Sequence, residues 1–225
     1  MNRFYAGMLS ISILIAASGC SRVLNFNQDK CISTAPVVTQ QRPASAVTNI
    51  IAANGFNISY SQSPKPRISV SAPSDLMDMV HTDIKGETLS IYSTKSLGAC
   101  DINIVVESPS VSDFTISSGT QFTIQGAYSS TSDVTVNISS GAMFIAPSSF
   151  SAPKIALGSS SGSQIKLDAI SSSAISAAAS SGSSVYLAGT SREAHLSVSS
   201  GAGISAGKLD ATSGSASASS GGSIT

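Results

Sequence analysis

The sequence predicts an all-β protein whose C-terminal half, residues 108–225, is a parallel β-solenoid, or β-helix, preceded by an irregular β region. Two observations carry this prediction. The tripeptide Ser-Ser-Gly recurs with spacings of 22, 21, 20, 19 and 20 residues between its glycines. Apolar residues keep fixed distances from these glycines, which a disordered serine-rich linker has no reason to do. The repeated glycines are Gly119, Gly141, Gly162, Gly182, Gly201 and Gly221.

The fixed distances describe two short strands, one on each side of a turn. The residues between the apolar positions are mostly serine, threonine, lysine, glutamine or other small groups, so the pattern alternates with the period of two that is typical of a strand. The third residue after each glycine is apolar in every repeat, namely Phe122, Phe144, Ile165, Val185, Ile204 and Ile224. The fifth residue before each glycine is also apolar, namely Phe114, Val136, Leu157, Ala177, Leu196 and Ala216.

A repeat of about twenty residues cannot bury its own apolar side chains, but stacked repeats about 4.8 Å apart can. Glycine suits a corner that needs a positive φ, and the neighbouring serines can bond to the backbone or to the next rung. The segment 174–179 is rich in alanine, which favours helix, but its phase in the repeat favours a strand. Small interior residues predict a thin core that narrows toward the C-terminus, at Ala177, Ala179, Ala216 and Ala218.

Residues 1–19 are expected to be a signal peptide, because Arg3 precedes an uncharged apolar run and small residues lead to Cys20. The run is shorter than the roughly 20 residues that span a bilayer. An ordinary secretory signal is the alternative. The segment resembles the signal peptides of bacterial lipoproteins, which implies cleavage before Cys20 and lipid on its sulfur. Ser21 in place of Asp implies transfer to the outer membrane, on its periplasmic or surface face. We expect this lipid to be the membrane anchor, since two or three acyl chains hold a protein firmly.

The remaining chain divides by composition. Residues 20–42 have no clean period and are expected to be a tether, whereas residues 43–107 alternate like short strands. Cys31 and Cys100 are the other cysteines, and in an oxidising compartment we expect them to form a disulfide. The sequence leaves two free thiols open as the alternative.

Two further motifs precede the Ser-Ser-Gly series. They are Gly55-Phe56-Asn57-Ile58 and the run Gly86-Glu87-Thr88-Leu89-Ser90-Ile91. With these motifs, residues 41–225 resemble the putative auto-transporter adhesin, head GIN domain family, a group of exported bacterial proteins of unknown function. The resemblance implies a β-helical fold, which agrees with the stacking argument.

Composition and motifs argue against nucleic-acid binding, a metal or cofactor site, and catalysis. The net charge is zero and only 11% of residues are charged, so no basic patch is available for nucleic acid. No cluster has metal-ligand spacing, and no cofactor or metal is expected. His195 is expected to face solvent, and His81 is the only other histidine. The acids that could serve a polysaccharide-active enzyme do not share one offset from the glycines, namely Asp113, Asp133, Asp168 and Asp210.

We therefore expect a lipid-anchored, non-catalytic envelope protein and not an enzyme. One hypothesis is an adhesin-like interaction module, a rigid rod that binds carbohydrate or an envelope protein through repeated outward side chains. The alternative is a structural scaffold that associates end to end, since the sequence stops within a sixth rung at Ile224 and Thr225. A polysaccharide-active enzyme is the less favoured third hypothesis.

Overall fold

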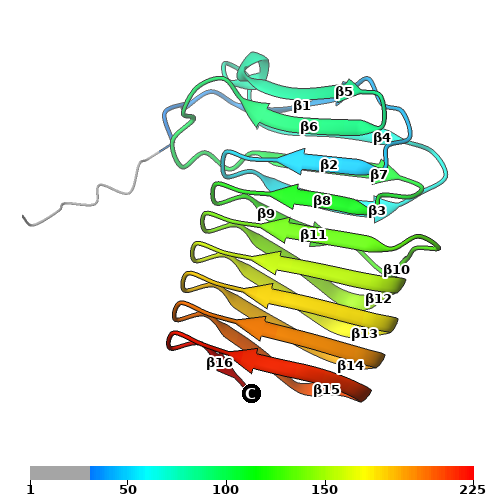
Figure 1. The fold of residues 1–225 in the computed structure, drawn as a ribbon. Helices are drawn as coiled ribbons and strands as arrows, with labels where there is room; N and C mark the ends of the chain where they lie inside the picture. The colour runs from blue at the N-terminus through cyan, green and yellow to red at the C-terminus, as the bar shows by residue number, and fades with distance from the viewer. Residues whose placement is uncertain (1–30) are drawn as a thin grey trace, which may run out of the picture.

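The computed structural model describes residues 31–225, and every structural statement below refers to that range. Its strands form one 16-stranded sheet that winds into a stack of rungs (Figure 1). The helical content of this range is a single 3₁₀ turn, η1 (Met77–Met79). The predicted all-β fold with a parallel β-solenoid is confirmed.

The regular rungs begin at residue 113, and all their strands pair in parallel. In β12 to β15 one long strand covers most of a rung and bends where its register shifts, as between Ala146 and Ser149. The strands of this part are β8 (Asp113–Ile116), β9 (Gln121–Ile124), β10 (Tyr128–Ser129), β11 (Val134–Ile138), β12 (Met143–Ser159), β13 (Gln164–Ala179), β14 (Ser184–Val198), β15 (Gly203–Ala218) and β16 (Ser223–Ile224).

Equivalent apolar residues lie directly over one another, as the repeat predicts. The third residue after each glycine forms one continuous column, in which Phe122 pairs with Phe144 and Phe144 with Ile165. The fifth residue before each glycine forms a second column, and Val136 and Leu157 are neighbours in it. These side chains close the interior, so the solenoid has a filled core and not a channel.

The N-terminal strands are stacked out of chain order. Strands β2 (Asn49–Ala52) and β3 (Asn57–Gln62) form a rung between β8 and β9 on one side and β6 (Thr88–Ser93) and β7 (Asn103–Ser108) on the other. All four of these pairings are parallel. Asn54 and Gly55 make the corner of this rung with φ of 78° and 76°. The chain therefore forms the rung of β2 and β3 first. It then forms the strands at the end of the stack and continues with β8 and β9 on the other side of that rung.

Antiparallel strands cover this end of the solenoid (Figure 1, top). Strand β1 (Val37–Arg42) pairs with β4 (Arg67–Pro73), β4 pairs with β7, and β5 (Val80–Lys85) pairs with β6. Strand β1 lies within the range expected to be a tether, so the ordered fold starts before residue 43. Its residues are mostly exposed, which is why they show no apolar alternation in the sequence.

The core narrows along the stack. Aromatic rings fill the end near the antiparallel strands, where Phe122 and Phe144 stack with centroids 5.5 Å apart and Tyr128 and Phe150 at 4.6 Å. Farther along, the buried residue Ala177 occupies the column position that Phe114 holds in the first regular rung. The expectation that Ala216 and Ala218 are also interior was wrong, because both are exposed where no further rung covers β15 within the described residues.

Candidate functional site

Each Ser-Ser-Gly corner is a four-residue turn. In the first corner the Thr120 amide donates to the Ser117 carbonyl at 3.2 Å, and Ser118 and Gly119 have φ of 56° and 72°. Two successive positive φ values are the pattern of a type I′ turn, in which glycine is favoured at the second position. The Gly119 amide also donates to the Ser140 carbonyl of the next rung at 2.9 Å. This bond recurs at every following corner except the last, so the corners form a hydrogen-bonded column.

The residue after each of the first five glycines points inward, and where it is serine its hydroxyl stabilises the turn. Ser163 and Ser183 are each 1% exposed. The Ser163 hydroxyl donates to the Ser160 carbonyl at 2.7 Å, and the Ser183 hydroxyl donates to the Ser159 carbonyl of the previous rung at 2.8 Å. These buried hydroxyls are fully used within the fold and are not available to a ligand.

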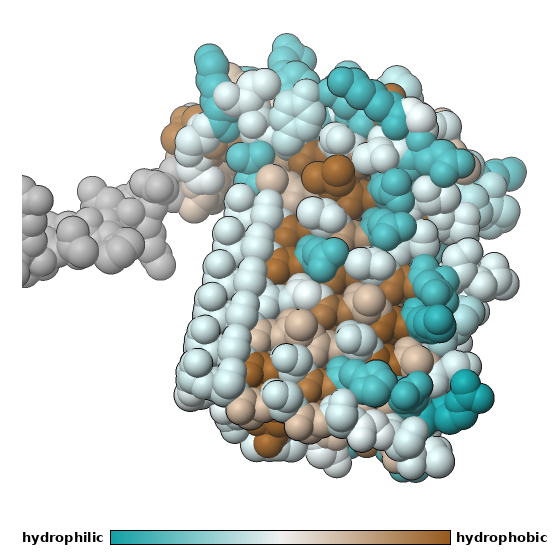
Figure 2. Space-filling model, in the orientation of Figure 1, coloured by the Kyte–Doolittle hydropathy of each residue, from teal (hydrophilic) through white to brown (hydrophobic). Residues whose placement is uncertain are grey.

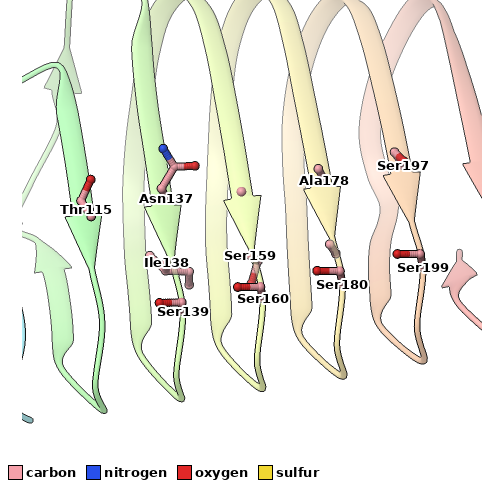
Figure 3. Close-up of a pocket in the computed structure, with 12 residues that line it drawn as sticks. Thr115, Asn137, Ile138, Ser139, Ser159, Ser160, Ala178, Ser180, Ser197 and Ser199 are labelled. Carbon is pink, nitrogen blue, oxygen red and sulfur yellow. The ribbon is translucent and has the colours of Figure 1, made fainter.

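The first serine of four successive corners faces a shallow groove of about 370 Å³, which we name the serine groove. Its hydroxyl oxygens point the same way from successive rungs (Figure 3). With a rung spacing of about 4.8 Å, the groove offers a periodic row of groups that both donate and accept hydrogen bonds. The row is Ser139, Ser160, Ser180 and Ser199, and the parallel row beside it is Thr115, Asn137, Gly158, Ala178 and Ser197.

Figure 2 shows that the corner side of the stack is nearly neutral in hydropathy, whereas hydrophilic residues gather at the antiparallel end and on the opposite side. The serine groove contains no charged side chain. Its lining therefore fits a neutral partner that offers many hydroxyl, amide or carbonyl groups, because a charged ligand would find no counter-charge there.

A second groove, of about 420 Å³, contains the charged residues of the same sheet face, among them Asp133, Lys154, Glu193 and His195. The His195 Nδ1 lies 2.9 Å from the Ser215 hydroxyl and its Nε2 lies 3.0 Å from the Glu193 carboxylate. His195 faces solvent as predicted, with its side chain 50% exposed. The order hydroxyl, imidazole, carboxylate resembles that of a hydrolytic triad, but the open sheet surface leaves the group in water.

The acidic residues do not form a column. Asp113 is aligned with Asn49 and Thr135, and Asp210 is aligned with Thr190. Asp168 instead pairs with Lys166 of its own strand, with Nζ and Oδ2 3.2 Å apart. Within residues 31–225, no group of three or more metal-ligating side chains is close enough to hold an ion.

A disulfide joins Cys31 to Cys100, with Cα atoms 4.2 Å apart. It ties the start of the described chain to the segment between β6 and β7. Cys20, the expected lipidation site, and the signal peptide lie outside the described residues. Among the residues that are described, none belongs to a helix with the length and apolarity needed to cross a membrane.

A third groove contains an aromatic residue that the repeat analysis did not single out. Tyr186 lines it together with Gln164, Ser184, Gly203 and Ser205. The signal was present in the sequence, because the fourth residue after a corner glycine points outward and is tyrosine only at position 186 among the repeats. We name it the tyrosine groove.

These features define a class of protein, a filled β-solenoid that displays uncharged polar rows on a rigid backbone. Residues 46–225 match the family described as putative auto-transporter adhesin, head GIN domain, and the chain belongs to this family. No curated protein shows significant similarity to the chain.

Solved structures share the fold. A protein from Parabacteroides distasonis named as a putative lipid binding protein superposes with a TM-score of 0.80, at 19% identity, over 85% of this chain and 82% of that one. A putative adhesin from Parabacteroides merdae has the same TM-score at 16% identity, over 85% and 81%. A second putative adhesin from P. distasonis also gives 0.80, at 14% identity, over 85% and 82%. At these identities the likeness concerns the fold.

Proposed function

We propose that the protein is a lipid-anchored module of the bacterial cell envelope that binds carbohydrate or protein partners without catalysis. The observation that carries this proposal is the alternation of inward and outward side chains along the rungs of β13 and β14. The core is continuous and closed, while uncharged polar groups repeat along the corners. Such an array suits many weak polar contacts with an extended partner, which is the kind of surface an adhesin head needs.

The anchoring part of the proposal rests on the sequence. The apolar run and small residues before Cys20 favour lipidation, and Ser21 favours the outer membrane. The Cys31–Cys100 disulfide agrees with an exported protein. Labelling cells with radioactive palmitate should mark the protein, and Cys20→Ser should abolish the label. Retained label in Cys20→Ser would contradict lipidation at this residue.

Binding is tested with the soluble chain from Ser21 to Thr225, which contains every described residue. We expect it to retain partners in a screen of envelope glycans and envelope proteins. Placing two charges in the serine groove, with Ser160→Glu and Ser180→Glu, should remove partners that use this groove. Ser173→Glu, at an exposed position outside the groove, is the matched control. A screen without partners would overturn the proposal, and so would turnover of any polysaccharide.

A scaffold is the second candidate function, and one observation favours it. Within residues 31–225, β16 and Thr225 cover β15 only at its start, from Gly203 to Ala206. Among the described strands none pairs with the rest of β15 on that side, and an exposed strand edge of this kind can pair with another chain. Sedimentation at increasing concentration should then show end-to-end assembly that Ser215→Lys prevents. A monomer at all concentrations would exclude this role.

A further inference from the structure

We infer that the tyrosine groove is a binding site for a neutral pyranose of a glycan. The inference rests on the proposed function and names the partner class for one surface. The groove lies on the segments of β13, β14 and β15 that follow the corners, and its volume is about 310 Å³. That volume is at the lower end for small-molecule sites, which run from about 300 to 1,000 Å³.

Two outward columns make the walls of the tyrosine groove. One column contains Gln164, Ser184 and Gly203, which are paired neighbours on successive rungs. The other contains Tyr186 and Ser205, also paired neighbours. The inward residues Val185 and Ile204, which are 2% and 1% exposed, close the floor between the columns.

The tyrosine ring has different surroundings on its two sides. Toward the preceding rung the Lys166 ammonium lies 5.8 Å from the ring centroid. Toward the following rung the aligned residue is Ser205, and Gly203 stands beside it in the neighbouring column. These two small residues leave space next to the ring. A Cβ at Gly203 would meet no atom within 4 Å, so the space is open.

The polar side chains around this space are accessible. The side chains of Gln164, Ser184 and Ser205 are exposed and that of Tyr186 is half-buried, so their polar groups face the groove and solvent. The corner hydroxyls of Ser163 and Ser183 are buried and bonded within the fold, whereas Gln164, Ser184 and Ser205 are exposed and open to a ligand. Side chains of this kind can donate and accept together, as sugar hydroxyls do.

The groove selects for a neutral pyranose. An aromatic ring carries a negative face, which attracts the slightly positive C–H groups on the apolar face of a sugar ring. The hydroxyls at the sugar edge would meet the amide of Gln164 and the hydroxyls of Ser184 and Ser205. No charged side chain lines the groove, and Lys166 is paired with Asp168. An anionic sugar would therefore gain no salt bridge in the groove.

Two variants test the site without disturbing the core. Tyr186→Ala removes the ring, and Gly203→Leu fills the space beside it. Gly203 has no positive φ and open space around its Cα, so a side chain is tolerated there. Gly207→Leu is the matched control, since Gly207 has the same freedom and lies outside the groove.

The measurement is ¹H–¹⁵N NMR of the chain from Ser21 to Thr225 with glucose, galactose, mannose and N-acetylglucosamine and their short oligosaccharides. We expect at least one of them to shift the amide signals of Ser184, Tyr186, Gly203 and Ser205. Tyr186→Ala and Gly203→Leu should each weaken that binding by about tenfold or more, and Gly207→Leu by less than about twofold.

The outcomes separate this inference from the proposed function. If the protein retains glycan partners in the envelope screen but none of the sugars shifts the groove, the groove assignment is wrong and the function stands. Shifts caused by peptides and not by sugars would overturn the ligand class. Sugar affinity that survives both Tyr186→Ala and Gly203→Leu would also overturn the site.

Discussion

Gly189→Ala tests how closely successive rungs approach each other at a bend. Gly189 lies in β14 with φ of 123°, and a Cβ there would be 2.3 Å from both the amide nitrogen and the carbonyl oxygen of Ile170 in the preceding rung. Both atoms belong to the backbone and cannot rotate away. The substitution must therefore separate two hydrogen-bonded rungs.

The expected cost has two parts. A residue held at an unfavourable φ costs about 1–3 kcal/mol, and overpacking costs about 1–3 kcal/mol more. Gly189→Ala should thus lower the free energy of unfolding by about 2–6 kcal/mol. Gly162→Ala isolates the first part, because Gly162 has φ of 71° and no atom within 4 Å of an added Cβ. Its cost should be about 1–2 kcal/mol.

Gly207→Ala completes the series. Gly207 has neither a positive φ nor a close neighbour, so alanine should stabilise the fold by about 0.4–1 kcal/mol through the entropy of the unfolded chain. Urea unfolding followed by far-UV circular dichroism measures all three. Because stacked rungs can unfold in parts, tyrosine fluorescence should be recorded as a second probe. If Gly189→Ala costs no more than Gly162→Ala, the close approach to Ile170 is refuted.

Three further predictions concern the core, the disulfide and a buried phenol. Ala177→Leu should lower the free energy of unfolding by about 1–3 kcal/mol through overpacking, whereas Ala178→Leu, its outward neighbour, should change it by less than about 0.5 kcal/mol; equal effects in urea titrations would contradict the predicted facing. Cys100→Ser should cost about 2–4 kcal/mol, since the disulfide closes a loop of 69 residues, and dithiothreitol should destabilise the wild type but not this variant. Burial raises the pKa of Tyr60 from 10.0 to about 12. This raised pKa stabilises the folded state below pH 10, and the stabilisation is lost as the pH rises toward 12, by about 1.4 kcal/mol per pH unit. Tyr60→Phe should therefore reduce the fall in the free energy of unfolding that is measured between pH 10 and pH 12.

The stack could be predicted from the sequence because its register is local. Each corner glycine fixes which residues point inward for several positions on either side, and Phe144 and Val136 lie in the columns that this rule assigns. The same rule also fits the earlier corner at Gly55, where the Ser-Ser-Gly tripeptide is absent. Ile58 and Tyr60 stand three and five positions after it and are buried.

The out-of-order rung could not be predicted in this way. The rung of β2 and β3 lies between strands that come later in the chain, and periodicity records offsets along the chain but not the order of stacking. The tyrosine groove could not be predicted from the sequence for a related reason. It exists because Tyr186 in one rung faces small residues in the next, and this relation appears only when the rungs are aligned.

The unequal rung lengths also acquire a physical explanation. One inward column is formed by Val134, Ile155, Ile175 and Ala194. In each of these rungs the next corner glycine follows that residue by 7 positions. The segment after the corner varies instead. Phe150 follows its corner glycine by 9 residues, Ile170 by 8 and Gly189 by 7, although all three are aligned. The shortest path coincides with Gly189, where an added Cβ would clash with the backbone of the preceding rung.

This distribution bears on where a ligand can bind. The corner bonds hold successive rungs in register, so length changes accumulate at the bends and not beside the corners. Rows next to the corners therefore keep a constant offset from the corner glycine in every rung, whereas at the bends this offset changes from rung to rung although the aligned residues still pair. The serine groove precedes the corners by two to four residues, and Ser184 and Tyr186 of the tyrosine groove follow theirs by two and four. A partner with its own repeat can match only rows of constant spacing. Both grooves lie beside the corners, where the rows have this constant spacing.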